Sequence, residues 1–274
     1  MPRRRVRVRR RHARSLRLSA LFLLAALIIY LVSLAVGGGA PAQEMAAEEG
    51  AQTSVAAGPA LTQQVSMAPL SVYLVELGAY GDDASARVEA ARNARRGAAG
   101  YILQENGVYY VMGACYDDKT QAQDVAARLT VSEQISAQVH EKSAGEVLLR
   151  VTASQAQVDA LAAADAALRE AAGQMGQIAF QLDGGELNAG QARARLEVLE
   201  LDAREALEAL RAAAGETGGP VIEGLCELLR DLLENLDARI HQDEETLLYF
   251  SAKMKYNVIA MRLEHIAYLS SLGA

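Results

Sequence analysis

The chain has 274 residues, enough for one or two domains of ordinary size. It has no Trp, three Phe and ten Tyr and is rich in Ala and Leu, which head the helix propensity scale, so we expect a large helical share. Nine of its basic residues are Arg within positions 1–17, and the rest of the chain has 18 basic and 34 acidic residues, a net charge of −16. Such an acidic body argues against nucleic acid and other polyanions as ligands and favours a neutral glycan or another protein.

The N-terminal segment has the pattern of a membrane anchor. The Arg-rich residues 1–17 are followed directly by nineteen uncharged residues, 18–36, and a membrane span takes about 20 apolar residues. Because basic flanks stay on the cytoplasmic side, we predict a cytoplasmic tail, one transmembrane helix and an extracytoplasmic remainder. The alternative is a signal peptide cleaved after the small residues Ala40 and Ala42, although the apolar core of a signal peptide has only about 7–15 residues.

The residues behind this segment are expected to form a linker. Residues 37–70 are mostly small and polar, include Pro41, Pro59 and Pro69, and show no apolar period, so we predict a flexible tether. The next proline is Pro220. Folded structure is therefore expected from residue 71 onward.

The first predicted elements after the linker are a strand and a helix. Residues 71–80 are rich in β-branched and aromatic side chains, which is typical of a strand. Asp82 and Asp83 are suitable N-cap residues for a helix over 84–96. Two glycines then end this helix.

A hairpin is predicted next. The dipeptide Asn106-Gly107 lies between the apolar runs 101–105 and 108–115. Asn-Gly in this position is the strongest short-range signal for a type I′ hairpin turn. We therefore predict two antiparallel strands joined by this turn.

The chain then repeats its first corner. "LGAYGDD" at 77–83 returns as "MGACYDD" at 112–118, ahead of a second predicted helix and a fourth strand at 135–141. We expect Gly78 and Gly113 to let each strand end turn sharply into its helix. The resulting order is β-α-β-β-α-β, a ferredoxin-like antiparallel sheet in an α+β protein.

The residues from Ser71 to about Glu141 resemble a SPOR domain, a small module of bacterial cell-wall proteins related to sporulation and division. The resemblance rests on the glycine corners, the Asn-Gly hairpin and the alanine-rich helices. The predicted SPOR-like domain covers residues 71–151 and so includes the possible strand that follows the resemblance. It implies a sheet with helices on one face. It also implies that the other face binds glycan strands of peptidoglycan that have lost their stem peptides.

Strand alternation assigns side chains to the two faces of this sheet. Val75, Leu77, Tyr110 and Met112 are expected to face the two helices. The open face is expected to carry Leu74 and the tentative glycan-binding residues, which are Glu76, Gln104, Tyr109, Val111 and Gln138. The resemblance implies that Tyr109 stacks on a sugar ring and that the polar side chains bond its hydroxyls. The alternative is that this face is buried, for example under the C-terminal helices.

The rest of the chain is predicted to be helical. Residues 147–151 alternate as a possible fifth strand beside the sheet, and residues 152–274 form an all-α bundle or hairpin. Apolar stripes with helical spacing run over 158–182, over 196–210 and from Pro220 onward. Residues 241–245 are either a turn or a charged part of one long helix. The stripes are interpreted as a bundle core, with a coiled-coil dimer seam as the alternative.

We predict no catalysis, no cofactor and no metal. The four histidines, which are His12, His140, His241 and His265, lack the spacing of a zinc site. The pairs Asp82–Asp83 and Asp117–Asp118 precede predicted helices and are better explained as N-caps than as catalytic acids. Whether Cys115 and Cys226 form a disulfide is left open.

Two functions follow from these predictions. The first is a single-pass protein of a bacterial cell membrane whose SPOR-like domain binds peptidoglycan glycan and targets the chain to division or sporulation septa. The second is a membrane-anchored scaffold with a SPOR-like fold that no longer binds glycan and contacts protein partners, for example through its C-terminal helices. No nucleic acid is expected as a partner.

Overall fold

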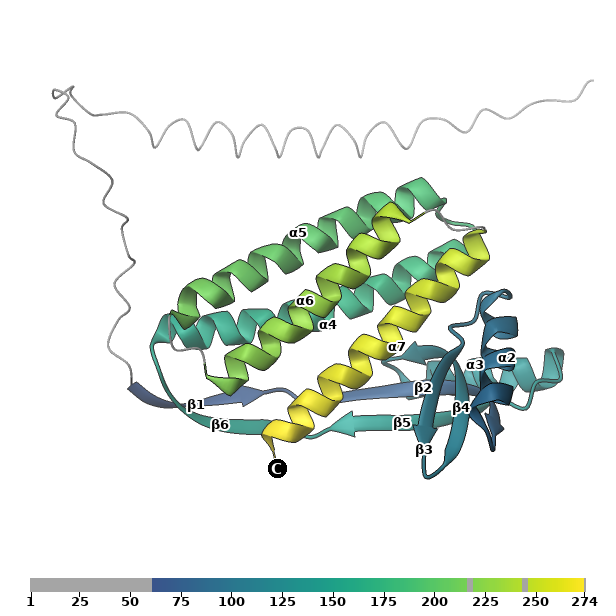
Figure 1. Ribbon diagram of the computed structural model, residues 1–274, viewed down its shortest axis with the longest axis horizontal. Coiled ribbons are helices and arrows are strands. Elements are labelled where there is room, and N and C mark those ends of the chain that lie inside the picture. Colours follow the sequence, from purple (N-terminus) through teal and green to yellow (C-terminus); the bar gives the residue numbers. More distant parts are fainter. Residues whose placement is uncertain (1–60, 216–218, 243–245, 274) are drawn as a thin grey trace, which may run out of the picture. The chain divides into compact units, whose positions relative to one another are not determined.

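The computed structural model describes residues 61–215, 219–242 and 246–273 (Figure 1). The predicted cytoplasmic tail, the predicted span at 18–36 and most of the predicted linker lie outside these ranges. No helix within them has both the length and the apolar content that crossing a membrane requires. Residues 55–274 form one compact unit with its own hydrophobic core. The described part is an α+β fold with six helices and two antiparallel sheets.

The larger sheet has four strands and is built in the predicted order of elements. These are β2 (Leu70–Tyr80), α2 (Asp83–Ala94), β3 (Tyr101–Glu105), β4 (Val108–Tyr116), α3 (Lys119–Ser132) and β5 (Gln138–Ala144). The strands lie in the order β3-β4-β2-β5, and every neighbouring pair is antiparallel. This confirms the β-α-β-β-α-β succession expected from the sequence.

Local turn and cap chemistry explains these boundaries. Asn106 and Gly107 both have positive φ angles, 50° and 78°, as a type I′ turn requires. The side chain of Asp82 accepts a hydrogen bond from the Ser85 backbone N–H at 2.8 Å, and Asp118 caps α3 in the same way. One aspartate of each pair is therefore the N-cap, as predicted.

The glycines of the repeated corner have a different role from the predicted one. Gly78 and Gly113 lie inside β2 and β4, and neither has a positive φ angle. The register between these strands shifts at this point, so the strands bulge instead of turning. A Cβ atom on Gly113 would lie 2.7 Å from Leu77 Cδ1, so this position is small because Leu77 packs on it.

A second, two-stranded sheet involves part of the predicted linker. Strand β1 (Leu61–Met67) pairs with β6 (Val147–Ala153), from Leu61 opposite Ala153 to Met67 opposite Val147. The prediction of a flexible tether is therefore wrong for these seven residues. The prediction that β6 extends the four-stranded sheet is also wrong, because its partner is β1.

Four helices complete the fold. They are α4 (Gln155–Asp183), α5 (Ala189–Ala214), α6 (Pro220–His241) and α7 (Leu247–Leu272). Ser154 and Asn188 form capping boxes at the starts of α4 and α5. Helix α6 ends at His241 and Thr246 caps α7, so these are two helices and not one long helix. The predicted apolar stripes are largely buried within the chain, as the interpretation of a bundle core expects.

Helix α7 is buried on nearly all sides. Thirteen of its 26 residues are buried, and they do not form a single stripe. It contacts β2, β3, β4 and β5 of the sheet and also packs on α4 and α6 (Figure 1). Because it is enclosed by the sheet and by two bundle helices, α7 is a core element of the fold.

Gly100 should be the glycine that tolerates substitution least. Its φ angle is +63°, and an added Cβ would lie 2.4 Å from the carbonyl oxygen of Ala90. Gly100→Ala should lower the free energy of unfolding by about 1–2 kcal/mol for the left-handed backbone and by about 1–3 kcal/mol more for the overlap. Gly107→Ala is the matched control, because Gly107 has φ +78° and nothing within 4 Å. Equal urea midpoints for the two variants would contradict the overlap.

Candidate functional site

The face of the sheet that was expected to be open lies under α7. Leu74 and Met112 on this face are fully buried and belong to the same core as the bundle helices. Tyr101 of β3 packs against Tyr256 of α7, with the ring centroids 5.1 Å apart. A sugar ring therefore has no access to the centre of this face.

The five predicted glycan-binding residues do not form one platform. Glu76 is 5% exposed and lies on the face under α7. Gln138 of β5 is directly opposite Glu76 in the sheet and lies on the same face. Val111 is fully buried against α2, and Tyr109 packs into the same small cluster on the other face. Gln104 pairs with Tyr109 across β3 and β4, and its Nε2 donates to the tyrosine hydroxyl at 3.3 Å.

A β-bulge explains why the face assignment failed on β4. Val75 pairs with Ala114 and Glu76 pairs with Met112, so Gly113 is an extra residue in β4. An extra residue reverses the alternation of side chains beyond it. Met112 and Tyr110 therefore turn toward the bundle core instead of facing α2 and α3, whereas Val75 and Leu77 on β2 face α3 as predicted.

A buried polar pair lies on the covered face. The Nε2 atom of His140 is 2.5 Å from the Oε2 atom of Glu76, and the His140 ring lies 5.1 Å from the ring of Tyr110. The carboxylate of Glu76 is thus bonded inside the protein. Its partner in the structure is a histidine of the neighbouring strand, whereas a sugar hydroxyl was expected.

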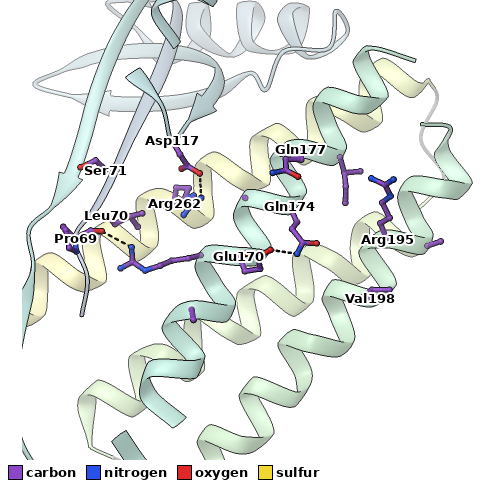
Figure 2. Close-up of a pocket in the computed structure, with 15 residues that line it drawn as sticks. Pro69, Leu70, Ser71, Asp117, Glu170, Gln174, Gln177, Arg195, Val198 and Arg262 are labelled. Carbon is purple, nitrogen blue, oxygen red and sulfur yellow. Dashed lines mark hydrogen bonds and ion pairs between the residues drawn. The ribbon is translucent and has the colours of Figure 1, made fainter. Parts of the chain in front are cut away.

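The surface offers a large groove where the sheet meets the helices. This seam groove has a volume of about 930 Å³ and is lined by residues of the β1–β2 junction, β2, the β4–α3 loop, α4, α5 and α7. Figure 2 shows its main side chains, which are Pro69, Leu70, Ser71, Asp117, Glu170, Gln174, Gln177, Arg195, Val198 and Arg262. Its lining includes hydrogen-bond donors and acceptors as well as the exposed apolar side chain of Val198.

Arg169 fixes one wall of the seam groove. Its guanidinium donates to the carbonyl oxygens of Ala68 at 2.6 Å and Pro69 at 3.0 Å, and its Nε donates to Asp165 at 2.8 Å. The other oxygen of Asp165 lies 2.8 Å from Nε2 of the buried His265. These five groups join α4, α7 and the β1–β2 junction into one hydrogen-bonded network.

Asp165 is ionised within this network. Burial alone would raise the pKa of its carboxyl group, but the hydrogen bonds from His265 and Arg169 outweigh burial and lower the pKa below its ordinary value. The carboxylate therefore remains charged at neutral pH. Its charge complements the arginine that fixes the wall.

Arg262 closes the inner end of the seam groove. Its side chain is buried in α7, and Nη2 lies 2.8 Å from Oδ2 of Asp117, whose side chain is mostly exposed (Figure 2). Arg169, Arg195 and Arg262 were not predicted as site residues. The signal that was available is the presence of Arg262 and His265 among the apolar residues at the C-terminal half of α7, because buried charged groups need partners.

Within the described ranges, no cluster of three or more His, Cys, Asp or Glu side chains is placed to hold a metal ion. Burial raises the pKa of the Cys115 thiol to about 12, so it is protonated and a poor nucleophile at neutral pH. Cys115 and Cys226 are both free, which answers the disulfide question for this structure.

A scan of protein-family models finds no match to this chain, and searches of curated proteins and solved structures find no similar protein. The resemblance to SPOR domains therefore rests on the sequence pattern alone.

The Asp165 network should stabilise the fold in a pH-dependent way. Asp165→Asn should lower the free energy of unfolding at pH 7 by about 3 kcal/mol, because it leaves the buried His265 and the partly buried Arg169 without the carboxylate that both contact. A lowered carboxyl pKa contributes stability above the unfolded pKa and loses it as pH falls through the folded pKa. The difference between wild type and variant should therefore shrink below about pH 4.

The control for this prediction is Asp159→Asn. Asp159 lies on the same helix, is exposed and accepts a hydrogen bond only from Gln155 at 2.8 Å. Its substitution should change the urea midpoint little at any pH. A difference between wild type and Asp165→Asn that is constant from pH 7 to pH 2.5 would contradict the proposed role of the Asp165 charge.

Proposed function

We propose that this chain is a membrane-anchored interaction scaffold of a bacterial cell envelope, with its SPOR-like sheet used as a structural support and not as a glycan platform. The observation that carries the proposal is the position of α7 over the sheet face. Its buried residues contact the sheet on one side and the bundle on the other, so uncovering the face would require breaking the core. The anchor at 18–36 and the extracytoplasmic location of the rest are parts of the proposal.

The seam groove is the proposed docking surface. Its walls come from both the sheet and the bundle and are fixed by internal bonds, including those of Arg169 and Arg262. Arg195 and Gln177 are exposed at its open side, next to Val198, which is 59% exposed. A groove lined by both polar and apolar groups suits an extended segment of a partner protein, because backbone and side-chain groups of the segment can satisfy the donors and acceptors while its apolar side chains contact residues such as Val198.

Glycan binding is supported less well by the geometry. Of the five residues predicted to bind sugar, Gln104, Tyr109 and Val111 lie on the α2 side of the sheet, whereas Glu76 and Gln138 lie opposite each other on the face under α7. One tyrosine and one amide offer less than the platform that the resemblance implies. The glycan hypothesis predicts that the chain binds cell-wall sacculi, whereas the scaffold proposal predicts that it does not.

Site-specific photocrosslinking tests the docking surface. A photoreactive amino acid in place of Val198, in the full-length chain in its native membrane, should give one discrete adduct with a partner protein. The matched control replaces Val88 of α2, which is 62% exposed and lies away from the groove. Adducts of the same size and yield at both positions, or at neither, would contradict the seam groove as the docking surface.

Co-sedimentation with cell-wall sacculi tests the choice between the two functions. The fragment 55–274 should remain in the supernatant when mixed with sacculi stripped of stem peptides, and Tyr109→Ala should behave identically. The reason is that the sheet face implied to bind glycan is covered by α7. Specific pelleting of the fragment that Tyr109→Ala abolishes would overturn the scaffold proposal in favour of glycan binding.

A further inference from the structure

The two helices of the repeated corner leave a gap above the sheet. Helix α2 packs on β2, β3, β4 and α7, and α3 packs on β2, β4 and β5, but the two helices have no substantial contact with each other. Their buried positions are all alanines, which are Ala86 and Ala90 in α2 and Ala122 and Ala126 in α3. Such short side chains cover the strands beneath them but do not fill the space between the helices.

A pocket with a volume of about 410 Å³ occupies this gap. We call it the inter-helix pocket. Its floor includes Val75, Leu77 and Ala114 of the sheet, and its sides include Leu129, Ile135 and Leu248. Except for the buried Val75, all of these side chains are partly or largely exposed, so the apolar core on this side of the sheet is incompletely covered. The volume and lining are those of a small-molecule site, in which apolar walls surround a few polar groups.

The charged side chains that line the pocket are three cations and two acids. Arg96, at the end of α2, and Arg128, on α3, line it and are exposed, and neither makes an ion pair with any described residue. Lys255 is buried at one end, where its ammonium donates to the Gly97 carbonyl at 2.7 Å and to Asp183. Glu133 is the remaining acid of the lining.

We propose that the inter-helix pocket binds a small amphipathic carboxylate, with its aliphatic body on the apolar floor and its carboxylate beside Arg96 and Arg128. Burial of the body removes apolar surface of both ligand and protein from water. The two arginines are unpaired cations in a chain whose residues beyond the N-terminal tail have a net charge of −16. Their guanidinium groups match the geometry of a carboxylate, so charge complementarity selects this headgroup over an amine. The proposal does not depend on the function of the seam groove.

Decanoate and decanol are suitable probes, because they share an alkyl chain and differ in the headgroup. Calorimetric titration of the fragment 55–274, which is one compact unit, avoids competition from detergent or lipid. Decanoate should bind with a single site. The double variant Arg96→Gln/Arg128→Gln should weaken decanoate at least tenfold and leave decanol binding unchanged.

A pocket-filling pair of variants locates the site. Ala114→Leu adds three carbon atoms on the pocket floor and should abolish binding of both probes, whereas Ala127→Leu on the exposed side of α3 should leave binding intact. Unfolding curves of both variants confirm that they are folded. The proposal is overturned if decanoate does not bind, if Ala114→Leu binds it as the wild type does, or if loss of both arginines weakens decanoate and decanol equally.

Discussion

The packing of α7 between the sheet and the bundle is the constraint on which the rest of the structure depends. Residues on both sides of it, such as Leu74 of the sheet and Leu229 of α6, belong to one hydrophobic core. Three charged or titratable side chains of α7 are buried, and each reaches a different neighbour: Lys255 the end of α4, Arg262 the β4–α3 loop and His265 the middle of α4. Because a buried charge without its partner is costly, these bonds fix both the rotation and the position of the helix.

This arrangement leaves concave surface at the boundaries between elements and not at the centre of a sheet face. A four-stranded antiparallel sheet with helices on one side ordinarily keeps its second face for solvent or a ligand. Here the second face is covered by α7, and concave surface remains only where elements meet at an angle or fail to meet. The seam groove is the first kind of surface, and the inter-helix pocket is the second. The first is lined by polar and apolar groups and the second is mainly apolar, so they suit different ligands.

The sequence predicted what depends on neighbouring residues and missed what depends on distant ones. The Asn106-Gly107 turn, the cap at Asp82 and the helical stripes are local, and each lies where it was expected. The bulge at Gly113 arises because Leu77 of another strand packs on it, so strict alternation along β4 misassigned Tyr109 and Val111. Strand β1 looked like a linker because its partner β6 lies more than eighty residues later. The buried Lys255, Arg262 and His265 of α7 likewise could not be predicted, because their partners are distant in the sequence.

The β1–β6 ribbon has a mechanical consequence. If the chain ahead of Leu61 is under tension, the load reaches the seven-residue ladder of β1 first and the two carbonyl bonds of Arg169 next. Pro69 is part of both the load path and the wall of the seam groove. The groove should therefore keep its shape while the β1–β6 pairing holds. A force strong enough to separate the two strands would act next on the groove wall at Pro69.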